Sequence, residues 1–339
     1  MSPHLAILAA GPSVTLQDAG RHGYLRYGIT AAGPMDPLAF ATANRAAGNP
    51  EGATAIEVSA GGITVAAEGG PLGLVLASTG FRVALDGQAL PASVALTLEP
   101  GRTLAVRAGT AGAWCYLALC GRVAVAPTLG STATHTRSGL GGLDGRALAA
   151  GDRLAVEEAR AGAGDPQTLV APWLDRPAEV IRVVLGPQDD AFAPDQIAAF
   201  LAGPWTVGGR GDRMACFLDG PRLTHARGHD IVSDGISMGA IQVPGEGLPI
   251  VLMADRQSTG GYPKIATVIG PDLGRLAQAQ AGARLRFSAV SVAEAVAARR
   301  AEAACLVPDI RTEPVIRTAF PSELLLGLNL VGGVIDAKG

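Results

Sequence analysis

The stretch that decides the fold is residues 240–267, AIQVPGEGLPIVLMADRQSTGGYPKIAT. It contains one short apolar run, residues 249–254, and the start of a second, residues 265–269, and both are bounded by Gly and Pro as buried strands commonly are. Between the runs lies a polar segment that opens with Asp255 and closes with Lys264. We therefore expect two core strands that carry a polar loop, and proteins commonly place functional side chains on such loops.

The composition of this loop indicates a functional site. It holds a carboxylate, a guanidinium, an amide, hydroxyls, a phenol and an ammonium, and the pair Gly260–Gly261 leaves room for a ligand or another backbone to come close. Among the 27 Lys and Arg residues, only Lys264 and Lys338 are lysines, and Lys338 is next to the C-terminus. A compact, movable charge inside the densest polar cluster favours a functional role for Lys264 over that of a solvated loop residue.

Overall composition predicts a mainly β fold, of the β-rich α+β kind, with a few short helices. Hydrophobic residues make up 48% of the 339 residues and aromatic residues 4%, while 46 Gly and 23 Pro favour many short elements joined by tight turns. Asp36 followed by Pro37 predicts the start of a helix that ends near Ala47. A second helix is expected after Pro194, and a capping box of Ser291 and Glu294 predicts a third.

The length favours two domains. Residues 159–177 are rich in Ala, Gly, Asp and Pro and form the best candidate for a linker. We expect a β-rich N-terminal domain over residues 1–165 and a C-terminal domain over residues 178–305. Residues 306–339 form an extended tail whose apolar end is expected to pack on the body or on a partner.

Charge and motifs exclude several functions. The net charge of −3 gives no electrostatic footprint for nucleic acid. No apolar run approaches the length of a membrane span, and the N-terminus lacks the features of a secretory signal, so we expect a cytoplasmic protein. The four cysteines form no C-x-x-C pair, and no metal site is expected, because a Gly between His225 and His229 argues against a helical ligand pair.

Three short blocks combine an acidic and a basic side chain: Gln17–Asp18–Arg21, Asp212–Arg213 and the loop from Asp255 to Lys264. Taken alone, each is best interpreted as a salt bridge that stiffens a loop. Three such blocks at strand ends fit a shared pocket better, because fixed cations and amides in a dry cleft suit an anionic substrate.

Several of these motifs together resemble one known family. The resemblance rests on TLQDAGRHGY from Thr15, GPMD from Gly33, GPQD from Gly186, DRM from Asp212, GAIQVP from Gly239 and DRQSTGGYPK from Asp255. The chain is similar to the KipA, or allophanate hydrolase subunit 2, family of biotin-dependent carboxyltransferase-like proteins, which includes the C subunit of 5-oxoprolinase. The similarity extends over nearly the whole chain.

The resemblance implies two cyclophilin-like β-barrel domains and a partner of the KipI, or subunit 1, type. It leaves three functions open. The chain is expected to be a component like the C subunit of an ATP-dependent 5-oxoprolinase, which converts 5-oxoproline to glutamate, with a lactam-hydrolase-like third subunit. It could instead move a carboxyl group from carboxybiotin to urea or a related amide, with a biotin carrier, or act as a non-enzymatic regulator that binds a KipI-type kinase inhibitor.

The absence of a biotin attachment signal favours the first function. No covalently bound cofactor is expected, and ATP or carboxybiotin would come through partner subunits. We expect a small anionic amide as substrate. The expected catalytic residues are Asp255, Arg256, Lys264 and Arg213, and the expected substrate-binding residues are Gln257, Thr259, Gly260, Gly261, Tyr262, Gln242, Gln17, Asp18 and Arg21. Arg256 and Lys264 would hold an anionic group, and Asp255 would orient Arg256 or move a proton.

Overall fold

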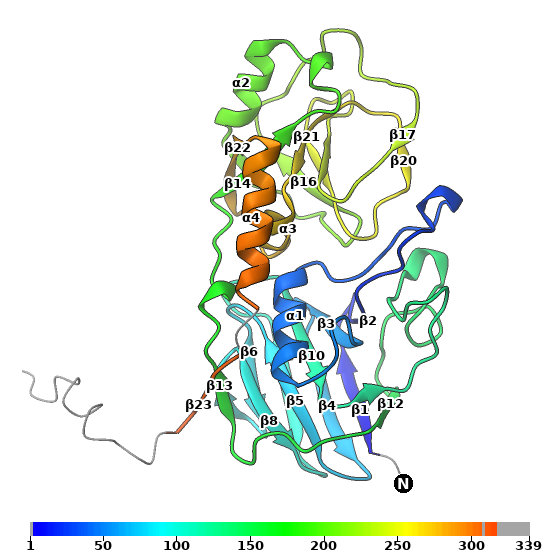
Figure 1. Ribbon diagram of the computed structural model, residues 1–339, viewed down its shortest axis with the longest axis vertical. Coiled ribbons are helices and arrows are strands. Elements are labelled where there is room, and N and C mark those ends of the chain that lie inside the picture. The colour runs from blue at the N-terminus through cyan, green and yellow to red at the C-terminus, as the bar shows by residue number, and fades with distance from the viewer. Residues whose placement is uncertain (1–2, 307–308, 317–339) are drawn as a thin grey trace, which may run out of the picture.

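The computed structural model describes residues 3–306 and 309–316 and is mainly β, as the composition predicts (Figure 1). The N-terminal half holds two seven-stranded sheets. In spatial order, the first consists of β11 (Arg122–Val123), β12 (Arg153–Glu157), β1 (His4–Ala10), β4 (Ile63–Glu68), β9 (Thr103–Arg107), β6 (Arg82–Leu85) and β7 (Gln88–Leu90). The second consists of β2 (Thr15–Gln17), β3 (Ala55–Ser59), β10 (Trp114–Leu119), β5 (Leu72–Ala77), β8 (Val94–Leu98), β13 (Gln167–Leu169) and β23 (Thr312–Pro314).

The two sheets share one apolar core built from Leu, Ile and Val side chains, among them Leu5, Ile63 and Leu74. Strand β4 alternates between buried and half-buried residues, so it covers the core with one face only. Every residue of β5 and β10 is buried, because helix α1 (Pro37–Ala46) packs on the outer face of the second sheet. The resemblance implied a barrel here, and the strands are divided between two sheets instead.

The C-terminal half is the closed barrel that the resemblance implied. Its strands follow the order β14 (Val180–Leu185), β21 (Lys264–Val268), β18 (Ala240–Gln242), β19 (Ile250–Leu252), β16 (Ala215–Asp219), β15 (Trp205–Val207) and β22 (Arg284–Ala289). The two apolar runs of residues 240–267 become β19 and β21. The segment between them also pairs, because β20 (Thr259–Gly260) joins β17 (Asp234–Gly235) as a separate two-stranded sheet.

Short helices surround the barrel and connect it to the N-terminal half. Helix α2 (Pro194–Ala202) packs on β22, and α3 (Gly270–Ala277) contacts α1, α4 (Val292–Ala304) and β14. Four short 3-10 helices complete the set in the described part of the chain: η1 (Leu25–Tyr27), η2 (Thr136–Ser138), η3 (Pro172–Leu174) and η4 (Asp189–Ala191). The predicted N-cap at Asp36 and the capping box of Ser291 and Glu294 are both present. A continuous apolar cluster runs from α1 into the barrel interior, so the two halves share a core.

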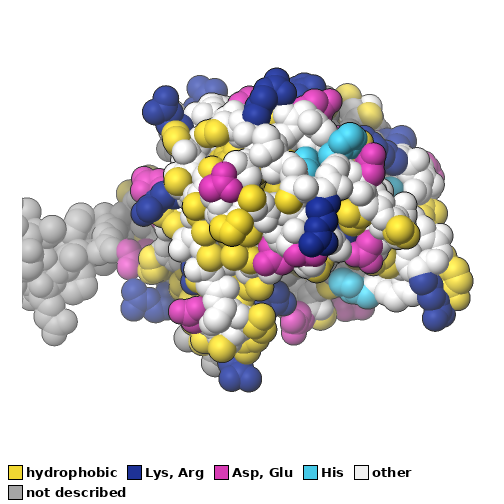
Figure 2. Space-filling view, turned by 90° about the horizontal axis from the view of Figure 1, so that it is seen from above, with side chains coloured by type: hydrophobic (Ala, Val, Ile, Leu, Met, Phe, Trp, Pro, Cys, Tyr) yellow, Lys and Arg dark blue, Asp and Glu magenta, His cyan; other side chains and the backbone are white. Residues whose placement is uncertain are grey.

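Charges of both signs are mixed on the surface of the barrel end. In the view from above, Lys and Arg side chains are interspersed with Asp and Glu, and apolar side chains lie among them (Figure 2). This mixing agrees with the small net charge of −3. This face therefore presents no broad field of one sign that would steer a highly charged partner.

The structure describes the linker and the start of the tail that were expected from the sequence. The proposed linker, residues 159–177, contains strand β13, which pairs with β8 and with β23 from the expected tail. The tail therefore begins as an edge strand of the second sheet, and its apolar end lies outside the described residues. The domain boundaries themselves stay a prediction. Among the described residues, no helix has both the length and the apolar character that a membrane crossing needs.

Candidate functional site

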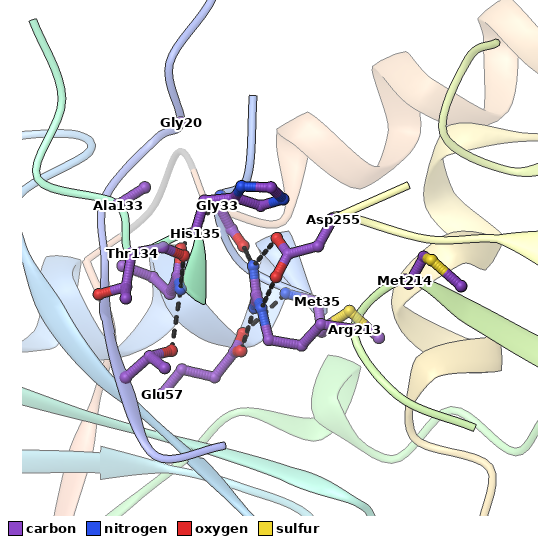
Figure 3. A network of polar contacts seen from close by, with 12 residues as sticks. Gly20, Gly33, Met35, Glu57, Ala133, Thr134, His135, Arg213, Met214 and Asp255 are labelled. Carbon is purple, nitrogen blue, oxygen red and sulfur yellow. Dashed lines mark hydrogen bonds and ion pairs between the residues drawn. The ribbon is translucent and has the colours of Figure 1, made fainter. Parts of the chain in front are cut away.

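Arg213 joins the two halves of the molecule through a buried network (Figure 3). Its Nε and Nη2 donate to the two carboxylate oxygens of Asp255, at 2.9 and 2.8 Å. On the other side its Nη1 donates to Glu57 Oε1, and its Nη2 also donates to the Gly33 carbonyl oxygen at 2.8 Å. The guanidinium therefore connects the barrel to strand β3 and to the segment that leads into α1.

The barrel positions this pair through ordinary strand pairing. Arg213 lies just before β16 and Asp255 lies just after β19, and these neighbouring strands pair antiparallel. The ladder continues past the strands, because Met253 N donates to Met214 O and Asp255 N donates to Arg213 O, each at 2.8 Å. Both side chains consequently lie at the same end of the barrel, which faces the N-terminal half.

Glu57 is the buried anion that Arg213 meets in the N-terminal half. Its Oε2 accepts the Tyr116 hydroxyl at 2.6 Å and the Met35 backbone N–H at 2.8 Å. Burial raises the pKa of Glu57, while the Arg213 charge and these hydrogen bonds act against the rise. Burial alone would lower the pKa of Arg213, but the neighbouring Glu57 and Asp255 raise it. The guanidinium therefore stays charged between two carboxylates.

Two cavities flank this network. The smaller has a volume of about 60 Å³, and most of the residues that line it are polar or charged. Its lining comes from both halves: Ser13, Thr15, Thr136, Arg137, Asp212, Arg213, Met214 and Asp255. The larger, of about 220 Å³, is mainly apolar and includes Met35, Trp114, Cys216 and Met253. Asp212 lines both, so the two cavities adjoin between the two halves of the molecule. Burial raises the pKa of Cys216 to about 12, which makes its thiol a poor nucleophile.

The predicted residues of the first polar block hold a neighbouring loop. Gln17 accepts from Gly33 N at 3.1 Å and donates to Thr134 O at 3.1 Å. Asp18 accepts from the Ser131 hydroxyl at 2.6 Å. Arg21 is 1% exposed and donates to three backbone carbonyl oxygens, those of residues 128, 131 and 133. These contacts fasten residues 128–134 beside the network, and Gly141 permits the fit because a Cβ there would lie 2.1 Å from Ala133 O.

The cations of the barrel loop lie against a different segment, residues 234–236. Lys264 is buried and its Nζ donates to Asp234 at 2.9 Å, while Arg256 Nε donates to Ile236 O at 3.1 Å. The hydrogen bond from Lys264 lowers the pKa of Asp234, and burial lowers the pKa of Arg256. A Cβ at Gly260 would lie 2.5 Å from Gln242 Nε2, so a side chain approaches this glycine and not the expected ligand or backbone.

The structure thus brings Arg213 and Asp255 together where the barrel meets the N-terminal half, and it places Lys264 and Arg256 on residues 234–236. Gln257, Thr259 and Tyr262 are exposed beside the loop, and Gly261 is half-buried. Asp255 bonds to Arg213 and has no hydrogen bond to Arg256 among the described contacts. Sequence reasoning missed Glu57 and Tyr116. The only available signal was one acidic residue inside the apolar run AIEVS of β3, which indicates a paired buried charge.

Comparison with known proteins places these features in a family. Residues 27–289 match the family model described as carboxyltransferase domain, subdomain A and B. The chain belongs to this family. It is 36% identical over 297 residues to the C subunit of 5-oxoprolinase from Escherichia coli (strain K12), and the match covers 87% of this chain and 94% of that protein.

Larger proteins share the same domain. The urea amidolyase of Saccharomyces cerevisiae is 30% identical over 85% of this chain, and the match covers 17% of that protein. The crystal structure of the K. lactis urea amidolyase gives a TM-score of 0.83 at 26% identity, over 91% of this chain and 20% of that chain. The expected family membership is confirmed, and these relatives are components of enzymes.

Proposed function

We propose that this chain is the counterpart of the C subunit in an ATP-dependent 5-oxoprolinase, which opens the lactam of 5-oxoproline to give glutamate. The observation that carries the proposal is the match to the Escherichia coli C subunit, which extends over 94% of that protein. The urea amidolyases match over a small fraction of their length, so they contain further domains that this match does not include.

The interface geometry supports a small amide as the ligand. Hydroxyls, two guanidinium groups and two carboxylates line the smaller cavity, and these groups can bond to an amide. Arg213 is held on both sides by Glu57 and Asp255, so it forms a fixed floor that does not reorganise when charge develops on a ligand. Asp255 lies on the same floor, where it can accept an amide N–H.

The remaining predicted residues form the second part of the proposed site. Lys264 and Arg256 would hold an anionic group of the substrate or of an activated intermediate, once the exposed Asp234 moves aside. ATP would be supplied through partner subunits, namely a KipI-type subunit 1 and a lactam-hydrolase-like third subunit. The homology to a named subunit supports such partners. We propose a cytoplasmic location for the assembly.

Reconstitution tests this function. The chain is purified with its subunit 1-type and third-subunit neighbours, and glutamate release from 5-oxoproline is measured with and without ATP. The expected result is ATP-dependent glutamate formation that requires all three proteins. Equal rates with and without this chain would reject the proposed role.

A second candidate is carboxyl transfer from carboxybiotin to urea or a related amide. The specific observation that favours it is the structural match to the K. lactis urea amidolyase. This function requires a biotinylated partner, so a streptavidin blot of a native pull-down distinguishes it from the first. A regulatory role toward a KipI-type protein predicts tight binding without turnover in the same preparation.

A further inference from the structure

Arg137 places an unbonded guanidinium on the lining of the smaller cavity. It belongs to η2, and its side chain is 61% exposed. Its Nη2 lies 3.8 Å from Asp212 Oδ2, which is beyond hydrogen-bond length. A guanidinium carries five N–H donors, and those of Arg137 make no hydrogen bond to any residue that the structure describes. These donors are therefore open to a ligand in the cavity.

The backbone that carries Arg137 is held in place. His135 N donates to Leu140 O at 2.9 Å, and Leu140 N donates back to His135 O at 3.2 Å, so the ends of this short loop are paired. Within the loop, Ser138 N donates to His135 O at 3.2 Å. The position of the Arg137 backbone is thus fixed, while its side chain keeps its donors open. A ligand that binds the guanidinium does not have to order the loop first.

The other charged side chains of the smaller cavity already have partners. Arg213 lies between Glu57 and Asp255. Asp212 accepts two backbone N–H groups through its Oδ1, at 2.7 and 3.2 Å. Its contact with Arg137 is long and at least half exposed on both sides, and such ion pairs contribute little in water. An incoming anion can therefore replace Asp212 as the partner of Arg137 at little cost.

Arg137 also lies close to apolar surface, because its neighbour Asp212 lines both cavities and the larger one includes Met35 and Met253. A small carboxylic acid with an apolar ring matches this combination. Two carboxylate oxygens accept from a guanidinium in parallel, and the ring methylene groups gain from leaving water. 5-Oxoproline is such an acid, whereas urea and 2-pyrrolidone have no carboxylate.

We propose that Arg137 is a substrate-binding residue whose guanidinium pairs with the carboxylate of an acidic lactam where the two cavities adjoin. The carboxylate takes the place of the loose Asp212 contact. The inference rests on the proposed function for the lactam, and it adds the residue that distinguishes an acidic substrate from a neutral amide. Lys264 and Arg256 are then left for the anionic group of an activated intermediate.

Ligand binding to the reconstituted complex without ATP tests this pairing. Dissociation constants of 5-oxoproline and of 2-pyrrolidone, the same ring without the carboxylate, are measured by ligand-observed NMR for wild type and Arg137→Gln. We expect Arg137→Gln to weaken 5-oxoproline binding about tenfold, as for the loss of one charge-assisted pair, and to change 2-pyrrolidone binding less than about twofold. Arg153→Gln is the matched control, because Arg153 in β12 is also 61% exposed and lines neither cavity.

The two ligands separate recognition of the carboxylate from a structural effect. Equal weakening of both ligands by Arg137→Gln would show a structural role and overturn the proposal. Unchanged 5-oxoproline binding by Arg137→Gln, or no binding of 5-oxoproline by the wild-type complex, would overturn it as well. Arg137→Lys retains the charge and loses the paired donors, so we expect it to recover part of the affinity for 5-oxoproline.

Kinetics distinguish failure of this inference from failure of the proposed function. In a complex that forms glutamate, we expect Arg137→Gln to raise the KM for 5-oxoproline about tenfold and to change kcat much less. A wild-type KM in that variant would reject Arg137 and leave the proposed function intact. Selective weakening of 5-oxoproline binding in a complex that forms no glutamate would support Arg137 and reject the 5-oxoprolinase assignment.

Discussion

Lys264 shows how burial changes the interpretation of a single residue. The sequence marks it as one of two lysines inside a polar cluster, and the structure adds that its side chain is 3% exposed and bonded to Asp234. A buried lysine is expensive unless it is paired, and Asp234 itself is 53% exposed. The ion pair can therefore open toward solvent more easily than the fully buried pair of Arg213 and Asp255.

Replacing Lys264 with Met tests its role in the proposed site. Met keeps most of the apolar stem and removes the charge, so the fold should persist. We expect glutamate formation by the complex to fall about 100-fold, as when one fixed donor for developing charge is removed. Lys338→Met removes the other lysine of the chain and serves as the control. Full activity of Lys264→Met would take Lys264 out of the mechanism.

Burial also predicts the order in which the cysteines react. Burial raises the pKa of both Cys115 and Cys216 to about 12, so at pH 8 only about 1 in 10⁴ of these thiols is ionised. Cys305, at the C-terminal end of α4, is half-buried. We expect iodoacetamide to modify Cys305 first, with the order read by mass spectrometry of peptides. Cys216 is also half-buried, so its modification at the rate of Cys305 would show that its raised pKa does not slow the reaction.

Elements whose signals are local were predictable from sequence, and those that depend on distant partners were not. The N-cap at Asp36 and the capping box at Ser291 place α1 and α4 correctly, because each signal acts within four residues. Strand β13 falls in the segment interpreted as a linker, because its pairing with β8 and β23 carries no local mark. The β17–β20 pair is similarly hidden inside polar sequence.

Asp272 fastens α3 to the barrel, and its pairing predicts a pH effect. Its buried carboxylate accepts the backbone N–H of Arg182 at 2.7 Å and two guanidinium N–H groups at 3.0 and 2.7 Å. Burial would raise the pKa of Asp272, but these hydrogen bonds outweigh it and lower the pKa. Because the folded-state pKa lies below the unfolded value near 3.9, the stabilisation is complete above that value and is lost as the pH falls through the folded pKa.

We therefore expect Asp272→Asn to lower the free energy of unfolding by about 3 kcal/mol at pH 7, since the change leaves Arg182 without its buried partner. The difference in free energy of unfolding between Asp272→Asn and wild type should shrink below about pH 4. Urea denaturation at pH 7, 5 and 3 measures both. Asp309→Asn, at a fully exposed carboxylate, should change little at any of these pH values. A difference from wild type that does not vary with pH would contradict the assignment.

At the scale of the whole molecule, the sequence predicted the fold class but not the contacts that join the two halves. Gly, Pro and low aromatic content indicate a β-rich protein, and the resemblance implies the closed barrel. Arg213 and Asp255, both expected site residues, are in contact, and their role in a site stays a prediction. However, its partner Glu57 lies 156 residues away, and no pattern in the sequence connects two such positions. Three polar blocks also predicted one shared pocket, whereas Lys264 and Arg256 bond to residues 234–236.

The buried network predicts that the two halves unfold together. We expect Glu57→Gln and Arg213→Met each to cost about 3 kcal/mol in free energy of unfolding, because the first removes one of the two buried carboxylates beside Arg213 and the second leaves Glu57 and Asp255 without their cation. The double variant should cost about 1–3 kcal/mol less than the sum, since the two residues are in contact. The surface pair of Arg102 and Asp86 is the control, and solvent screening should leave its two substitutions additive. Additive effects at Glu57 and Arg213 would show that their contact does not join the halves.

The central claim is that the domain interface around Arg213 and Asp255 is the site where this carboxyltransferase-family chain meets its amide. The most direct measurement compares ATP-dependent glutamate release from 5-oxoproline by reconstituted complexes that contain the wild-type chain or Asp255→Asn, with assembly checked by size-exclusion chromatography. The account predicts that the Asp255→Asn complex assembles and is at least about 100-fold slower. Glutamate release at the wild-type rate from an assembled Asp255→Asn complex would contradict it.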